Sequence, residues 1–167
     1  MPEGHRLLRI GLISDTHDLL RPEAEAALRG CDHVIHAGDI TVPQILQELS
    51  GVAPVTAVRG NNDRDDWAQA LAETEILHFS GHAVFVIHDL AQLPQFPPPP
   101  DVRVVVCGHS HKPSVQTIDG VLYVNPGSAG RRRFKLPVAV AELLIDGDQV
   151  RAQIIELEVA PAGKRSR

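Results

Sequence analysis

The hydrophobic positions of the first third of the chain form short, nearly continuous runs. Residues 7–14 (LLRIGLIS), 32–37 and 53–59 are mostly apolar, which is typical of strands buried on both faces. Between them, residues 21–30 and 42–50 each carry a proline near their start and a glycine at or just after their end, as short helices do. Alternating strands and helices predict parallel strands that are joined by right-handed crossovers.

The pattern changes after residue 62. Residues 67–71 predict a helical turn, and the runs at 75–79 and 83–88 predict a hairpin around Ser80-Gly81. Four consecutive prolines at 97–100 exclude a helix or an inner strand, so residues 89–101 are expected to form a short helical turn and then an extended surface segment.

The remaining apolar runs predict a strand-rich, mainly antiparallel second half. One further buried strand is expected, and two hairpins are expected to turn at Asp119-Gly120 and Asp146-Gly147. The predicted strands cover residues 102–107, 114–118, 121–124, 138–145 and 149–157.

Length and composition limit the class of protein. A chain of 167 residues suits one domain, predicted here over residues 1–159, with a flexible tail at 160–167 because that end is small, basic and contains proline and glycine. No apolar run approaches the roughly 20 residues of a membrane span. The N-terminal residues lack the apolar core of a secretory signal, so a cytoplasmic protein is expected.

Charge and cysteine usage narrow the choice further. The net charge of −5 argues against an extended nucleic-acid surface but is compatible with a small phosphoester substrate. Two cysteines, Cys31 and Cys107, do not make a disulfide framework and are expected to be core thiols. Strand alternation points Cys107 away from the histidines that follow it.

Side chains that bind metals gather where the predicted strands end. In open α/β sheets the carboxyl ends of the strands converge on one crevice, so residues far apart in sequence can meet there. The motifs are Asp15-Thr16-His17, Gly38-Asp39, Gly60-Asn61-Asn62-Asp63, His88 and Gly108-His109-Ser110-His111.

Each motif alone has a simpler interpretation. A single histidine is usually a surface or core residue, Asp15 or Asp39 would suit a helix cap, and Asn61 would suit a left-handed turn beside Gly60. Capping explains one aspartate more easily than both, and the motifs together favour a metal site. His36 is expected to be a core histidine because its strand neighbours are apolar.

Together these five motifs resemble those of the calcineurin-like metallophosphoesterases, and within them the small YfcE-like phosphodiesterases. The resemblance covers nearly the whole chain, and Asn125-Pro126-Gly127-Ser128 resembles a further loop of that subgroup. It implies a four-layer α/β/β/α sandwich of two mixed β-sheets flanked by helices.

The resemblance also implies a ligand set for two divalent metal ions. Asp39 would bridge the two ions. One ion would be held by Asp15, His17, Asp39 and His111, and the other by Asp39, Asn61, His88 and His109. Independently, this mixture of carboxylates, amide and imidazoles favours Mn, here the first choice, or Fe, Ni or Zn over calcium and magnesium.

Two such ions would activate water, so we expect a metal-bound hydroxide to attack phosphorus in line. No GxSxG motif suggests a protein nucleophile. Phosphodiester hydrolysis is the favoured reaction and phosphomonoester hydrolysis the alternative. A third hypothesis is a non-catalytic protein-interaction scaffold resembling the retromer vacuolar-sorting subunit. The competent side chain at every ligand position argues against this hypothesis. Assembly into dimers or tetramers is compatible with the resemblance.

Departures from the family pattern leave several roles open. Asn62 stands where many members have a histidine that protonates the leaving group; its amide can donate only a hydrogen bond to a phosphoryl oxygen, which favours substrates with acidic leaving groups. Asp63 would orient Asn62 or another ligand, or be an exposed turn residue. Asp89, where the family commonly has glycine, would repel phosphate or orient His88. Arg131 to Arg133 would contact phosphate or form a solvated basic turn.

Overall fold

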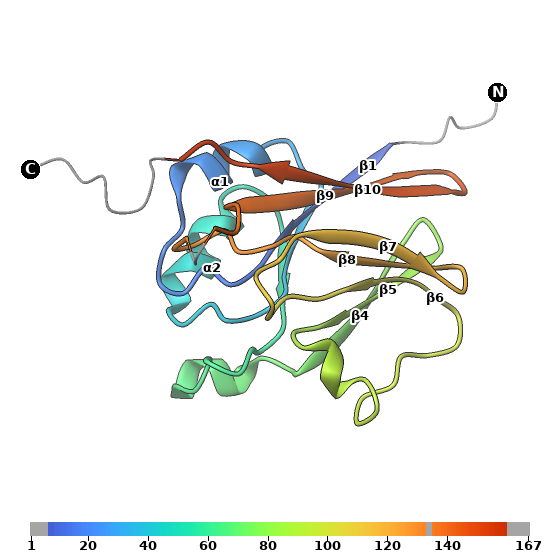
Figure 1. Ribbon diagram of the computed structural model, residues 1–167, viewed down its shortest axis with the longest axis horizontal. Coiled ribbons are helices and arrows are strands. Elements are labelled where there is room, and N and C mark those ends of the chain that lie inside the picture. The colour runs from blue at the N-terminus through green and yellow to red at the C-terminus, as the bar shows by residue number, and fades with distance from the viewer. Residues whose placement is uncertain (1–6, 133–134, 160–167) are drawn as a thin grey trace, which may run out of the picture.

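Two five-stranded sheets carry the fold in the computed structural model, which describes residues 7–132 and 135–159 (Figure 1). The predicted tail at 160–167 lies outside the described residues. In the first sheet β1 pairs in parallel with β2, and β2 with β3, as the alternation of strands and helices predicted. The order is β10-β9-β1-β2-β3, formed by Gln149–Glu156, Ala139–Asp146, Leu8–Ile13, His33–His36 and Val55–Ala57.

Helices α1 (Pro22–Leu28) and α2 (Pro43–Ser50) cover the outer face of the first sheet. Each begins with a proline at its first position, where the missing N–H has no helical partner to lose. Leu28 and Leu49 are fully buried against that sheet. Within the described residues no helix is long and apolar enough to cross a membrane.

The second sheet has the order β4-β5-β6-β8-β7. The expectation of a mainly antiparallel second half is wrong at the centre of this sheet, where β5 pairs in parallel with β6 and β6 with β8. The β7–β8 hairpin inserts its second strand beside β6, and its first strand becomes the edge. The strands are Thr74–Phe79, His82–Ile87, Val102–Val106, Ser114–Ile118 and Val121–Asn125 for β4 to β8 in turn.

A long connection makes the parallel pairing of β5 and β6 possible. The chain leaves β5, forms the 3₁₀ helix η2 (Leu90–Gln92) and crosses the outer face of the sheet before it enters β6. Leu93 and Phe96 of this connection pack against the outer cluster of the sheet, which contains Phe85 and Val105. The predicted fourth layer is therefore present, and it consists of a 3₁₀ helix and extended chain.

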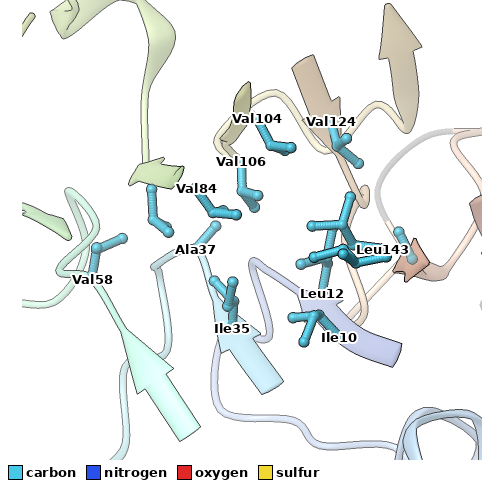
Figure 2. Packing of buried hydrophobic residues seen from close by; sticks show 13 residues of the cluster. Ile10, Leu12, Ile35, Ala37, Val58, Val84, Val104, Val106, Val124 and Leu143 are labelled. Carbon is cyan, nitrogen blue, oxygen red and sulfur yellow. The ribbon is translucent and has the colours of Figure 1, made fainter. Parts of the chain in front are cut away.

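The main core lies between the two sheets, where side chains from both inner faces meet (Figure 2). Val84 and Val86 point inward, whereas Phe85 and Ile87 point to the outer cluster, and all four are buried. Burial of both faces explains why the sequence shows continuous apolar runs rather than alternation. This dry, close-packed core holds the strand ends, and the loops that follow them, in fixed positions.

Candidate metal centre

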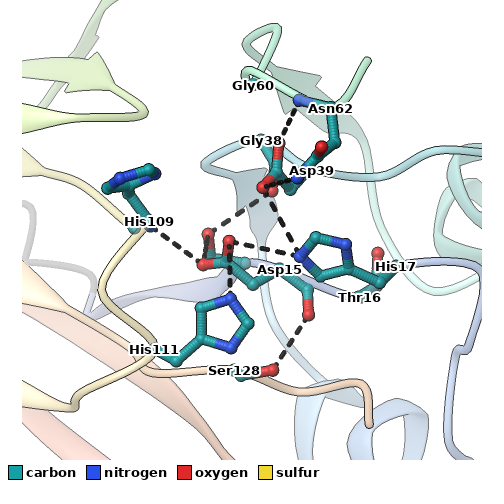
Figure 3. A network of polar contacts seen from close by, with 12 residues as sticks. Asp15, Thr16, His17, Gly38, Asp39, Gly60, Asn62, His109, His111 and Ser128 are labelled. Carbon is teal, nitrogen blue, oxygen red and sulfur yellow. Dashed lines mark hydrogen bonds and ion pairs between the residues drawn. The ribbon is translucent and has the colours of Figure 1, made fainter. Parts of the chain in front are cut away.

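Five loops converge at one end of the two sheets, each directly after a strand. They follow β1, β2, β3, β5 and β6, as predicted from the positions of the motifs. Figure 3 shows Asp15 at the centre, with His17, His109 and His111 around it and Asp39 beside Asn62. All nine predicted site residues lie in one connected network of contacts: Asp15, His17, Asp39, Asn61, Asn62, Asp63, His88, His109 and His111.

Asp15 is fully buried, and its two carboxylate oxygens have different surroundings. Oδ2 accepts hydrogen bonds from Ser14 Oγ at 2.8 Å and from the backbone N–H of His109 at 3.0 Å. Oδ1 accepts no hydrogen bond from the described residues. It faces the Nε2 atoms of His111 at 3.5 Å, His17 at 3.8 Å and His88 at 3.9 Å.

Asp39 lies between the two predicted ligand sets. Its Oδ2 is 3.4 Å from His17 Nε2, which belongs to the first set, and 3.4 Å from His88 Nε2, which belongs to the second. Asn62 donates to both carboxylate oxygens, from its backbone N–H at 2.8 Å and its side-chain Nδ2 at 2.9 Å. This geometry suits a carboxylate that two ions share.

Asn61 brings together the histidines of the second set. Its Oδ1 is 3.0 Å from His88 Nε2 and 3.2 Å from His109 Nδ1. His88 Nδ1 lies 2.7 Å from Ala37 O, and because a carbonyl can only accept, this nitrogen carries the proton. The lone pair of neutral His88 is therefore on Nε2, which faces the site.

The donor atoms form two overlapping groups that could each hold a cation. One contains Asp15, His17 and His111, and the other Asp15, Asp39 and His88, with all ligand atoms of a group within 4.8 Å of one another. A buried carboxylate oxygen without a hydrogen bond is costly unless a cation compensates it, so Asp15 Oδ1 fits this chemistry. In this geometry Asp15 belongs to both groups, whereas the resemblance gave the shared position to Asp39.

The electrostatics of the centre favour anionic carboxylates. Burial alone would raise the pKa of Asp15, but the contact with His17 and the nearby His88 and His111 outweigh it and hold the pKa below its usual value. Asp39 follows the same pattern, with burial opposed by His88 and Asn62, and its pKa is also lowered. Burial opposes the charged form of His88, yet its two carboxylate neighbours raise its pKa. A bound cation would replace the proton on His88 as the positive charge that stabilises the two carboxylates.

Backbone strain is concentrated in the same loops. Nine described residues other than glycine have positive φ, and seven of them lie in the loops of the centre. The other two, Ser80 and Asp119, form hairpin turns. The seven are Asp15, His17, Asp18, Asp39, Thr41, His109 and His111. Such conformations cost roughly 1–3 kcal/mol each and persist where the surroundings enforce them, most often at functional sites.

Asp63 is buried, so its interpretation as an exposed turn residue is wrong. Its carboxylate accepts four backbone hydrogen bonds of 2.7–2.9 Å. The donors are the N–H groups of Asp39, Ile40, Thr41 and Gly60. Asp63 thus ties the loop after β3 to the loop after β2 and fixes the backbone of Asp39.

Two glycines of the motifs are required by close approach. A Cβ at Gly60 would lie 2.3 Å from both the N and the Oδ1 of Asp39, and one at Gly108 would lie 2.1 Å from Ser14 Oγ. Gly60 does not have positive φ, and neither does Asn61, so the left-handed turn considered for Asn61 is wrong. Contact between loops, rather than turn geometry, explains the glycine at position 60.

Other predictions about single residues can also be compared with the structure. Neither Asp15 nor Asp39 caps a helix, because the N-caps of α1 and α2 are Arg21 and Val42. Cys107 is buried in the outer cluster of the second sheet, as predicted, and burial raises its pKa to about 12. Arg131 and Arg132 are exposed, and Arg133 lies outside the described residues.

The sequence interpretation noted the 125–128 loop and His36 but did not predict that they hold the loops of the centre together. Ser128 donates to Asp15 O at 3.0 Å, and Asn125 Nδ2 donates to Gly108 O at 3.1 Å, so the 125–128 loop supports the loops after β1 and β6. His36 is a core histidine, as predicted, and links two further loops. Its Nδ1 accepts from Gly38 N–H at 3.1 Å, so Nε2–H donates to Thr16 Oγ1 at 3.0 Å. The sequence signal for this role of His36 was a polar residue inside an apolar strand.

Burial of His36 predicts that the metal-free protein loses stability as the pH falls below about 6.5. Burial lowers the pKa of His36 to about 3, whereas the unfolded chain has a value of about 6.5. Between these values only the unfolded chain binds the proton, so the free energy of unfolding should fall by up to roughly 1.4 kcal/mol per pH unit. The raised pKa of His88 changes the stability only above this pH range, and the lowered pKa of Asp15 changes it only below this range.

Urea unfolding with a chelator present, at about pH 6.5 and about pH 5, measures this slope. His36→Gln keeps a donor and an acceptor but does not titrate, so its slope should be clearly shallower. Burial also lowers the pKa of His33, which would leave a residual slope in the variant. Equal slopes for the two proteins would contradict the assignment to His36.

Comparisons with known proteins agree with this geometry. Residues 8–148 match the family model of the calcineurin-like phosphoesterase superfamily domain. A probable metallophosphoesterase of Methanothermobacter thermautotrophicus is 35% identical, over 87% of this chain and 91% of that protein. The phosphodiesterase MJ0936 of Methanocaldococcus jannaschii is 29% identical, over 72% of this chain and 83% of that protein.

A solved structure shares the fold at low sequence identity. Vacuolar protein sorting 29 from Cryptosporidium parvum superposes with a TM-score of 0.77 at 20% identity, covering 93% of each chain. This likeness concerns the arrangement of the two sheets. The family match, by contrast, spans every strand-end motif of the centre, and the chain therefore belongs to the calcineurin-like phosphoesterase superfamily.

Proposed function

We propose that this protein is a metal-dependent phosphodiesterase with a dinuclear centre. The observation that carries the proposal is the position of Asp39 Oδ2, 3.4 Å from one histidine of each predicted ligand set. Membership of the superfamily and the similarity to a phosphodiesterase support the reaction class.

The residues of the centre would hold the two ions as the resemblance to the family implies. Asp15, His17, Asp39 and His111 would bind one, and Asp39, Asn61, His88 and His109 the other. Manganese remains the first choice, with iron, nickel or zinc as alternatives. When bound, two such cations would lower the pKa of a water molecule between them and clamp the oxygens of an in-line displacement at phosphorus.

The surrounding protein would prepare this centre in two ways. Ala37 O fixes the proton of His88 on Nδ1, and the Asp63 carboxylate fixes the backbone at Asp39. Both ligands are thereby oriented before any ion binds, which limits the reorganisation that binding requires.

The charge around the centre favours a diester over a monoester. Asp89 lies 3.7 Å from His109 and adds a carboxylate beside the second ligand set, where a dianionic monoester would be repelled more strongly than a monoanionic diester. Asn62 also cannot protonate a leaving group, which weighs against monoesters of poor leaving groups.

Metal analysis combined with two assays tests the proposal. The metal-replete protein should hold about two ions per chain and hydrolyse bis(4-nitrophenyl) phosphate faster than 4-nitrophenyl phosphate. A higher kcat/KM for the monoester would instead identify a phosphomonoesterase. Absence of stoichiometric metal, with no turnover on added manganese, nickel or zinc, would favour the protein-interaction scaffold that its likeness to vacuolar protein sorting 29 keeps open.

Substitution of Asn62 should change how the rate depends on the leaving group. Asn62→His introduces a general acid beside Asp39, where Asn62 Nδ2 now lies 2.9 Å from Oδ2. General acids contribute about 10²–10⁴-fold where the leaving group is poor, so the gain should grow with the pKa of the leaving alcohol, and at least about tenfold is expected for alkyl esters relative to nitrophenyl esters.

The measurement is the slope of log kcat/KM against leaving-group pKa. Asn62→His should flatten this slope, whereas Asn62→Ala, which removes the amide without adding an acid, should not. If Asn62→His leaves the slope as in the unmodified protein, a leaving-group role for position 62 is rejected.

A further inference from the structure

A side pocket opens next to the second ligand set. It is a small cavity of about 70 Å³ that opens to solvent, and it is lined by residues from the loop after β3, the residue just before β4 and the loop after β5. Asn61 and His88 belong to both the pocket and the candidate centre. A phosphorus atom held at the centre would therefore carry one of its ester substituents into this space. The lining residues are Arg59, Gly60, Asn61, Glu73, His88, Asp89 and Gln92.

The one arginine of the pocket is already engaged. Arg59 Nη2 lies 3.1 Å from Glu73 Oε2, and Nη1 donates to Gln69 Oε1 at 3.2 Å. Its charge is therefore compensated within the protein, and both of its terminal nitrogens already have a partner. Arg59 is a structural part of the wall and a poor anchor for a second anionic group of the substrate.

Asp89 gives the pocket an additional negative charge in a fixed place. Its Oδ1 accepts from Ala91 N–H at 3.0 Å, as the cap of η2, so the carboxylate cannot turn freely. Its Oδ2 lies 3.7 Å from His109 Nε2, at the border between pocket and centre. One arginine against two carboxylates, Glu73 and Asp89, leaves the wall with a net charge of −1 when the histidines are neutral.

We propose that this pocket selects one ester substituent of the substrate, and that the substituent is a cationic amino alcohol; this rests on the phosphodiesterase proposal. Carboxylate oxygens and the Gln92 amide offer acceptors to an ammonium or hydroxyl group. An anionic substituent would meet uncompensated negative charge. Asp89 is the specificity residue, because Glu73 is already paired with Arg59. This gives a role to a carboxylate that stands where the family commonly has glycine.

Three chromogenic diesters test the charge preference. Each carries 4-nitrophenol as leaving group, and the other substituent is 2-aminoethyl, ethyl or carboxymethyl. The kcat/KM values of the metal-replete protein should fall in that order, with about tenfold or more between the first and the last, since partly exposed ion pairs contribute modestly. Equal values for the three esters, or a preference for carboxymethyl, would overturn the proposal.

A pocket variant assigns the preference to its residue. Asp89→Asn should reduce the ratio of kcat/KM between the aminoethyl and carboxymethyl esters by at least about threefold. Asp101→Asn removes an exposed carboxylate at the opposite end of β6 and should keep the original ratio. A ratio unchanged in Asp89→Asn would overturn the proposal.

Binding can be followed without turnover. In ¹H–¹⁵N spectra of the metal-replete protein, 2-aminoethyl phosphate should shift the side-chain amide signals of Gln92 more than phosphoglycolate does, and the reverse order would count against the pocket. Failure to hydrolyse any of the three esters with manganese, nickel or zinc would reject the phosphodiesterase proposal itself. Hydrolysis without charge preference would reject the pocket alone.

Discussion

Asp39→Asn is expected to lower kcat/KM for a nitrophenyl diester by about 10³-fold and to reduce the bound metal below two ions per chain. Asp39 Oδ2 faces a histidine of each ligand set, so the substitution removes negative charge from both positions. An amide nitrogen in place of Oδ2 would also face Asn62 Nδ2, which now donates to that atom. Loss of roughly 4 kcal/mol of transition-state stabilisation corresponds to this rate change.

Asp119→Asn is a matched control for this experiment. Asp39 and Asp119 both have positive φ, at 61° and 51°, so each substitution places asparagine in a left-handed conformation that it tolerates. Asp119 lies in the β7–β8 hairpin turn, away from the strand-end loops. Metal content by elemental analysis and the rate should stay as in the unmodified protein. Two retained ions and a rate within about threefold for Asp39→Asn would remove its bridging role.

The central strands were predictable because they are buried on both faces. A continuous run of β-branched and aromatic residues, such as residues 84–87 of β5, favours a strand over a helix. Their partners were harder to predict. Nothing in the sequence of β7 and β8 says that the second strand of the hairpin, rather than the first, lies beside β6. That choice depends on packing of Val124 against the inner core, which is a tertiary property.

The donors of the centre were predictable for a related reason. A carboxylate or histidine directly after a buried strand must lie at the sheet edge where the strands end, so position alone brought Asp15, Asp39 and His88 together. The residues that orient them were not predictable in this way. The role of Asp63 depends on four backbone N–H groups, and every residue type except proline supplies one.

The interpretation of Asp89 needed the fold for a different reason. Its distance from His109 and its place in the pocket wall arise from two loops that belong to different strands, β5 and β6. The sequence showed an unexpected carboxylate next to His88. The parallel pairing of β5 with β6 places Asp89 beside His109. This position gives the unexpected carboxylate a role in specificity that can be tested.

Asp63→Asn should lower the free energy of unfolding by roughly 3–5 kcal/mol, because one of the two oxygens becomes a donor and leaves two buried backbone N–H groups without acceptors. Those bonds also hold the positive φ of Asp39 and Thr41, so metal affinity should fall with stability. Urea unfolding with and without manganese measures both effects. Asp65→Asn, an exposed neighbour, should stay within about 0.5 kcal/mol of the unmodified protein. If Asp63→Asn were equally neutral, its carboxylate would not be the residue that fixes the Asp39 loop.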